Sequence, residues 1–125
     1  MQTAAHYDLI IVGGGPAGLC LASALAGSGL RLALVEPQTR EALLDPAFDG
    51  REIALTHHSV ELLTQLGVWA GIPADQIHPL CDARILDGQG LVQEFTISHR
   101  DGRRSQLGYL VANHWIRRAA MAAVA

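Results

Sequence analysis

The spacing of apolar residues changes twice within the first 36 positions of the chain. Residues 9–12 form an apolar run that is too short for a helix and rich in β-branched side chains, which predicts a buried strand. Residues 16–28 carry apolar side chains at helical spacing, and we expect Gly29 to end this helix. The helix positions expected to face the sheet are Leu21, Ala22, Leu25 and Ala26. Alternating leucines in residues 30–35 predict a second strand, which completes a parallel βαβ unit.

A second helix is predicted after a loop over residues 37–49. Thr56 is placed to cap its N-terminus, and Gly67 is placed to end it. Its apolar positions at helical spacing are Val60, Leu63 and Leu66. We expect Trp69 and Ile72 to pack the end of this helix onto the core.

The period changes to that of antiparallel strands in the last third of the chain. Residues 83–87 and 91–98 flank a turn at residues 88–90, which predicts a β-hairpin. Residues 108–111 predict a short strand, and Asn113 is placed to cap a final helix. The hairpin does not suit a parallel sheet, so we expect it to begin a second domain inserted between strands.

Glycines stand at three positions between the first strand and its helix, in the G-x-G-x-x-G spacing of dinucleotide-binding turns. Gly13 lets the chain turn sharply, Gly15 lets the backbone approach a pyrophosphate, and Gly18 lets the helix pack close to the strand. Pro16 suits the first helical turn because its missing N–H would have no intrahelical partner there. The N–H groups at the positive end of the helix would then face phosphates. The turn therefore predicts a nucleotide-binding site.

Glu36 ends the second strand, roughly 20 positions beyond the glycines, where such sites hold a ribose. A carboxylate accepts two hydrogen bonds from a ribose diol and repels a 2′-phosphate. The nucleotide half held here is therefore expected to be an unphosphorylated adenosine.

Composition narrows the class of protein. The chain has 125 residues, of which half are hydrophobic and 17% are charged, which is typical of one small globular domain at most. The net charge of −3 gives no basic field for nucleic acid. Apolar runs fall short of the roughly 18 residues of a membrane span. Residues 1–6 have neither the basic start nor the apolar core of a secretory signal, so we expect none there. Cys20 and Cys81 make no disulfide framework, which fits a reducing cytoplasm.

Two groups of polar residues could in principle form a metal site or a pair of catalytic carboxylates. His57, His58 and Glu61 lie within one helical turn, but a metal would need further converging ligands. Asp82 and Asp87 flank a hairpin strand, and we interpret them as turn and edge residues. We expect no metal site and no acid–base catalyst among these 125 residues.

Three blocks resemble a known family. Residues 8–19 and 32–36 read DLIIVGGGPAGL and LALVE, and they resemble the N-terminus of FAD-dependent aromatic hydroxylases. Residues 49–69 read DGREIALTHHSVELLTQLGVW and are similar to the ubiquinone-biosynthesis branch of those flavoprotein monooxygenases. Residues 107–120, LGYLVANHWIRRAA, resemble the segment of that branch before the third parallel strand. The resemblance implies a two-domain enzyme, of which this chain would be the first third.

The resemblance also implies roles in cofactor binding. The glycines would cradle the FAD pyrophosphate, Glu36 would bind the adenosine ribose, and Arg51 would reach the FAD phosphates as a fork-shaped donor. The implied FAD-binding set is Gly13, Gly14, Gly15, Pro16, Ala17, Gly18, Glu36 and Arg51. Relatives commonly carry an arginine at position 114, where this chain has His114, so no flavin contact is assigned there.

The implied reaction is hydroxylation of an aromatic ring in a ubiquinone precursor, dependent on NAD(P)H and O2. In this class the nicotinamide reduces tightly bound FAD, the reduced flavin traps O2 as a C4a-hydroperoxide, and an electron-rich ring takes the terminal oxygen. A polyprenyl tail on the substrate would bring the complete enzyme to a membrane surface. We therefore expect a cytoplasmic protein that works at the inner face of the membrane and binds no nucleic acid.

The expected fold is α/β, a Rossmann-like FAD-binding βαβ unit with the start of an inserted antiparallel β domain, and incomplete. Residues 1–81 would form the N-terminal part of the FAD-binding domain, residues 82–112 the first hairpin and strand of the substrate domain, and residues 113–125 a returning helix. Two parallel strands alone would leave an uncovered apolar face, so we expect the isolated chain to be inactive and to bind FAD weakly or not at all. Two alternatives stay open: a truncated nucleotide-binding module without activity, and another FAD oxidoreductase of the halogenase or prenyl reductase type.

Overall fold

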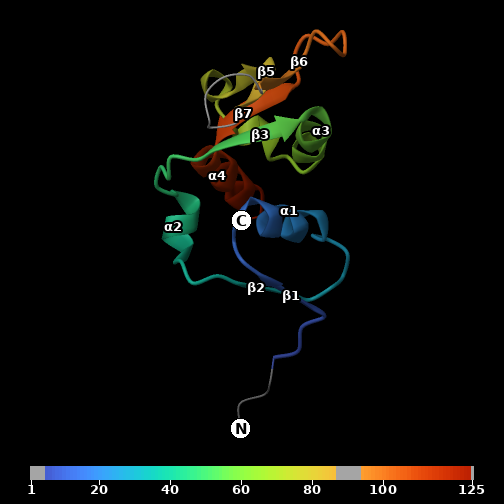
Figure 1. Ribbon diagram of the computed structural model, residues 1–125. Helices are drawn as coiled ribbons and strands as arrows, with labels where there is room; N and C mark the ends of the chain where they lie inside the picture. Colours follow the sequence, from blue (N-terminus) through green and yellow to red (C-terminus); the bar gives the residue numbers. More distant parts are fainter. Residues whose placement is uncertain (1–4, 87–93, 125) are drawn as a thin grey trace.

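The structure is a computed structural model that describes residues 5–86 and 94–124 (Figure 1). Its strands are β1 (Leu9–Val12), β2 (Leu32–Val35), β3 (Glu52–Thr56), β4 (His78–Leu80), β5 (Asp82–Leu86), β6 (Glu94–Ser98) and β7 (Gly108–Ala112). Its helices are α1 (Pro16–Ala24), α2 (Arg40–Leu44), α3 (His57–Gln65) and α4 (Asn113–Val124), with the short 3-10 helices η1 (Trp69–Gly71) and η2 (Ala74–Gln76). The strands form three separate sheets, ordered β1-β2, β3-β7-β4 and β5-β6.

The predicted βαβ unit is confirmed. β1 and β2 pair in parallel, with Leu9 opposite Leu32 and Val12 opposite Val35, and α1 connects them. The helix ends at Ala24 rather than at residue 28. The chain needs positive φ at the next two glycines, which lie at positions 27 and 29 with φ of 79° and 83°, so the helix cannot continue through them.

The face that α1 buries differs from the predicted one. Leu19 and Ala22 are buried, whereas Leu21 is 46% exposed and Ala26 lies beyond the end of the helix. Figure 1 shows α1 between the β1-β2 sheet and α4, and it packs against all three elements. The apolar stripe predicted from a sheet alone was therefore wrong at Leu21 and Ala26. Cys20 is half-buried beside this core, and burial raises the pKa of its thiol, which suits a small apolar residue better than a reactive one.

The parallel sheet is covered on one face only. Ile11 is buried, but Ile10 and Val12 are 58% and 83% exposed, so the prediction of a buried strand holds for one of its central positions alone. The exposed fraction of Val35 on β2 is 54%. The uncovered apolar face expected for two parallel strands is present among the described residues.

The three-stranded sheet was not predicted, because its pairings join segments far apart in sequence. β7 lies at its centre and pairs antiparallel with β3 on one side and β4 on the other. The strands approach so closely that a Cβ atom on Gly108 would lie 2.1 Å from the carbonyl oxygen of Leu55. The sequence groups this strand with the hairpin before it, whereas its hydrogen bonds join it to β3 and β4. The proposed domain boundaries stay a prediction.

The predicted ends of α3 are confirmed, whereas the predicted cap of α4 is wrong. The hydroxyl of Thr56 accepts a hydrogen bond from the Ser59 amide, and Gly67 has a φ of 73°, so both predicted ends of α3 are confirmed. Asn113, predicted as a cap, is instead the first residue of α4, and its side chain donates to Asp49. A helix cap would use the side-chain oxygen of Asn113 as an acceptor, whereas the bond to Asp49 uses its side-chain NH2 group as a donor.

The core forms where α4 meets α1, α2 and η1. Its buried members are Leu19, Leu43, Leu63, Val68, Ile72, Val111, Ile116, Ala119, Ala120 and Met121. Ile72 is buried and Trp69 packs against this cluster, as expected. The core thus fixes the βαβ unit against the segment that carries Arg51.

The predicted antiparallel hairpin is confirmed as the pairing of β5 with β6, from Asp82 opposite Ser98 to Leu86 opposite Glu94. Its predicted turn at residues 88–90 lies outside the described residues. None of the helices within residues 5–86 and 94–124 has the length and apolar character needed to cross a membrane.

Candidate functional site

The glycine turn has the geometry that its spacing predicts. Gly13 has a φ of 110°, in the region that favours glycine, and its N–H donates to the carbonyl oxygen of Val35. A Cβ atom on Gly18 would lie 2.0 Å from the carbonyl oxygen of Gly13 and 3.3 Å from the Cγ2 atom of Ile11. Glycine at position 18 therefore lets α1 start directly against β1.

The N-terminus of α1 is open to a ligand. Pro16 occupies the first turn, and Gly15 is the N-cap residue with no side-chain hydrogen bond to the helix. A Cβ atom built on Gly15 would meet no atom within 4 Å. The helix dipole and the amide groups of Ala17 and Gly18 are thus available to an anion at this point, which fits a nucleotide pyrophosphate.

Glu36 lies against the same turn. Its Oε2 atom accepts a 2.6 Å hydrogen bond from the Gly14 amide, and its Oε1 atom accepts one of 3.0 Å from the Gln38 amide. The two bonds, with a smaller contribution from the charge of Arg117, hold the pKa of this carboxyl below its usual range. An ionised carboxylate beside a glycine turn can accept hydrogen bonds from a ribose diol.

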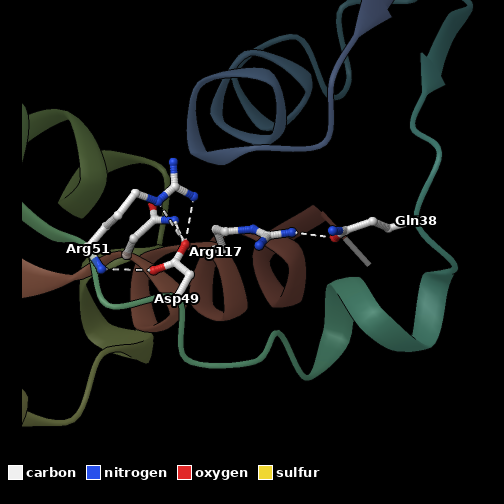
Figure 2. A network of polar contacts seen from close by, with 5 residues as sticks. Gln38, Asp49, Arg51 and Arg117 are labelled. Atoms are coloured by element: carbon white, nitrogen blue, oxygen red, sulfur yellow. Dashed lines mark hydrogen bonds and ion pairs between the residues drawn. The ribbon is translucent and has the colours of Figure 1, made fainter.

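Arg51 lies directly before β3 and is hydrogen-bonded to Asp49. Its Nε and Nη2 atoms donate to Oδ2 of Asp49 at 2.9 and 2.6 Å. Figure 2 marks these contacts as dashed lines. These bonds and the amide of Asn113 hold the pKa of the Asp49 carboxyl well below its usual range. The Arg51 side chain stays 65% exposed, and its contact with a phosphate stays a prediction.

His114, to which the sequence analysis assigned no flavin contact, lies beside two aromatic rings. Its ring is 5.4 Å from that of Phe48 in an edge-on arrangement, and 5.0 Å from that of Trp115. Its Nδ1 atom is buried and has no hydrogen-bond partner within the described part of the chain. That His114 makes no flavin contact stays a prediction.

One contact near Glu36 was missed by the sequence analysis. Arg117 on α4 donates from Nη2 to Oε1 of Gln38 at 2.6 Å, across 79 residues of sequence (Figure 2). It brings a positive charge close to the end of β2. Its position on a helix with a second arginine at 118 gave no signal that would have separated it from a solvated surface residue.

His57 and His58, which were considered as metal ligands, contact protein groups in the structure. The Nε2 atom of His57 is 3.1 Å from the carbonyl oxygen of Gln106, and its ring lies 6.0 Å from Tyr109. His58 is exposed and lies 3.6 Å from Glu61. Both contacts account for these side chains without a metal, and within residues 5–86 and 94–124 no three potential ligands gather to hold one.

Comparison with known protein families settles the class of this domain. Residues 6–107 match the family described as FAD binding domain. The chain belongs to this family. The match includes the glycine turn, Glu36 and Arg51, and FAD is therefore the cofactor of the family to which the site belongs.

Curated relatives refine the comparison. The chain is 48% identical over 118 residues to ubiquinone hydroxylase UbiM of Neisseria meningitidis, a match that covers 92% of this chain and 26% of the relative. It is 34% identical over 113 residues to ubiquinone hydroxylase UbiL of Rhodospirillum rubrum, covering 90% of this chain and 25% of the relative. The chain thus spans about a quarter of the length of these relatives.

A solved structure agrees on the fold. A mutant of PqsL from P. aeruginosa superposes with a TM-score of 0.65 over 96% of this chain and 31% of its own, at 21% identity. At that identity the likeness bears on the fold alone. The α/β fold with a partial FAD-binding domain is therefore supported, while the roles of individual residues toward FAD stay predictions.

Proposed function

We propose that the complete protein carrying this chain is an FAD-dependent monooxygenase that hydroxylates the ring of a ubiquinone precursor, with NAD(P)H and O2 as co-substrates. The observation that supports this most is the glycine turn joined to Glu36, in a chain 48% identical to a ubiquinone hydroxylase over 92% of its length.

The residues of this chain bind and orient the cofactor in the proposed reaction. Glu36 takes the ribose hydroxyls of the adenosine, the N-terminus of α1 faces the pyrophosphate, and Arg51 supplies N–H donors to the phosphates. FAD, when bound by these residues, would supply the redox chemistry that activates O2 for the hydroxylation. We assign no acid–base step to a residue of this chain.

The proposed substrate also implies where in the cell the complete enzyme works. A ubiquinone precursor has a polyprenyl tail that partitions into a bilayer, so the complete enzyme would meet its substrate at the membrane surface. We propose a cytoplasmic protein that works at the inner face of the membrane.

The test is an assay of the complete polypeptide. The purified protein is examined for a bound flavin spectrum and then given a short-tailed ubiquinone precursor, O2, and either NADH or NADPH. We expect a product heavier by one oxygen atom, formed only with O2 and a nicotinamide donor.

Two results would contradict the proposal in different ways. Bound FAD and NAD(P)H oxidation without oxygen added to any ubiquinone precursor would indicate a different FAD oxidoreductase. A complete polypeptide that binds no FAD would favour a module without this activity.

A further inference from the structure

The carboxylate of Asp49 joins two segments that lie 64 residues apart. Its Oδ2 atom accepts hydrogen bonds from Nε and Nη2 of Arg51 and from Nδ2 of Asn113, at 2.9, 2.6 and 2.7 Å. Its Oδ1 atom accepts one from the backbone amide of Arg51 at 3.2 Å. The backbone amide of Asn113 donates in turn to the carbonyl oxygen of Arg51 at 2.8 Å. The segment before β3 is thus fixed to the start of α4 by main-chain and side-chain bonds.

This arrangement holds a long and exposed side chain in one orientation. The Arg51 side chain is 65% exposed, whereas that of Asp49 is only 25% exposed. An exposed arginine otherwise samples many rotamers, and ordering it when a ligand binds costs free energy. Asp49 engages Nε and Nη2, and Figure 2 shows a terminal nitrogen of Arg51 pointing away from the carboxylate. That nitrogen keeps its donors for another partner.

The charge of Asp49 acts on the affinity of Arg51 for a phosphate in two opposite ways. A negative charge beside Arg51 weakens its attraction for a phosphate by simple electrostatics. The same charge also holds the guanidinium in place, which lowers the cost of ordering it. The side-chain amide of Asn113 shares the charge of Asp49 and reduces the first effect.

We propose that Asp49 is a positioning residue, which holds the Arg51 guanidinium in the orientation that the phosphates of FAD require. The inference rests on the proposed function, in which Arg51 contacts those phosphates. It assigns Asp49 an action through Arg51, and no contact of its own with the cofactor.

The experiment is a double-mutant cycle on the complete polypeptide with its flavin removed. FAD affinity is measured by the change in flavin fluorescence for the wild type, Asp49→Ala, Arg51→Ala and the double variant. We expect about a tenfold loss for Arg51→Ala and about a fivefold loss for Asp49→Ala, from charge-assisted bonds of ordinary strength. The double variant should bind no more weakly than Arg51→Ala alone, because Asp49 then has nothing to position.

Controls separate this role from a general loss of structure. Asp49→Asn keeps the side-chain shape and should lose affinity in the same direction, if Asp49→Ala proves too unstable to purify. Asp45→Ala removes an exposed carboxylate of the same segment and should bind FAD like the wild type. Urea unfolding of each variant reports stability separately from affinity.

The contradicting outcomes are distinct. Unchanged or tighter FAD binding by Asp49→Ala would mean that its charge only weakens Arg51, and equal losses with and without Arg51 would mean a structural role. Normal FAD binding by Arg51→Ala would overturn the positioning role while leaving FAD binding itself intact. A wild-type protein that binds no FAD would overturn the proposed function together with this inference.

Discussion

The backbone amide of Gly14 donates a 2.6 Å hydrogen bond to Oε2 of Glu36, across 22 residues of sequence. This bond joins the turn after β1 to the end of β2, so the two predicted parts of a nucleotide site lie against each other. A Cβ atom on Gly14 would come within 3.1 Å of the same carboxylate. The closeness of the two residues therefore depends on glycine at position 14 and on parallel pairing of the two strands.

Two glycines of the turn should respond differently to a methyl group. Gly18→Ala would place Cβ 2.0 Å from the carbonyl oxygen of Gly13, so we expect a loss of about 3 kcal/mol in the free energy of unfolding. Gly15→Ala meets no atom within 4 Å and keeps an ordinary φ of −78°, so its stability should stay within about 0.5 kcal/mol of the wild type.

The readouts for this pair are urea unfolding and FAD titration of the complete polypeptide. We expect Gly15→Ala to keep its stability and to lose FAD affinity by about tenfold, because its methyl group would occupy the approach of the pyrophosphate. Full FAD affinity in Gly15→Ala would place the phosphates elsewhere. Unchanged stability in Gly18→Ala would contradict the close contact of α1 with β1.

Acid should remove the stabilisation that Asp49 provides. Its bonds to Arg51 and Asn113 lower the pKa of the carboxyl in the folded state, so the folded protein binds its proton less readily than the unfolded chain. The contribution is complete above the ordinary carboxyl pKa of about 4 and is lost as the pH falls below it.

This prediction is checked by urea unfolding at several pH values. The stability difference between the wild type and Asp49→Asn should be largest near pH 7 and shrink steadily below about pH 4. Asp45→Asn, which removes an 84% exposed carboxylate with a 3.8 Å ion pair to Arg118, should show a smaller difference throughout. A difference for Asp49→Asn that stays constant with pH would rule out this role for its charge.

The isolated 125-residue chain should bind FAD weakly or not at all. Its parallel sheet exposes Val12 at 83%, Ile10 at 58% and Val35 at 54%, so the support beneath the glycine turn is covered on one face only. A fluorescence titration of this chain with FAD should show no saturation at micromolar cofactor. Saturation at micromolar FAD would mean that the βαβ unit with α4 is sufficient for the site.

The sequence predicted features whose causes are local. The turn at Gly13, the close contact at Gly18, and the ends of α3 at Thr56 and Gly67 follow from backbone conformations and bonds within a few residues. Glu36 was found from its distance to the glycines, because a βαβ unit brings the ends of adjacent parallel strands together.

The remaining features depend on partners far away in sequence. The pairing of β7 with β3 and β4 joins segments that no local period connects. Leu21 was assigned to the buried face because the sheet was considered without α4. Asn113 was assigned as a helix cap because the Asp49 carboxylate, 64 residues away, was not expected beside it. These three features depend on contacts between segments that are distant in sequence and meet only in the folded chain.

The most direct measurement is the FAD affinity of the complete polypeptide in its wild-type form and as Glu36→Ala. If Glu36 binds the adenosine ribose, the variant should bind FAD about tenfold more weakly and lose flavin during dialysis, while Asp45→Ala retains it. A Glu36→Ala protein that folds normally and keeps its full flavin content through dialysis would contradict the assignment of this site.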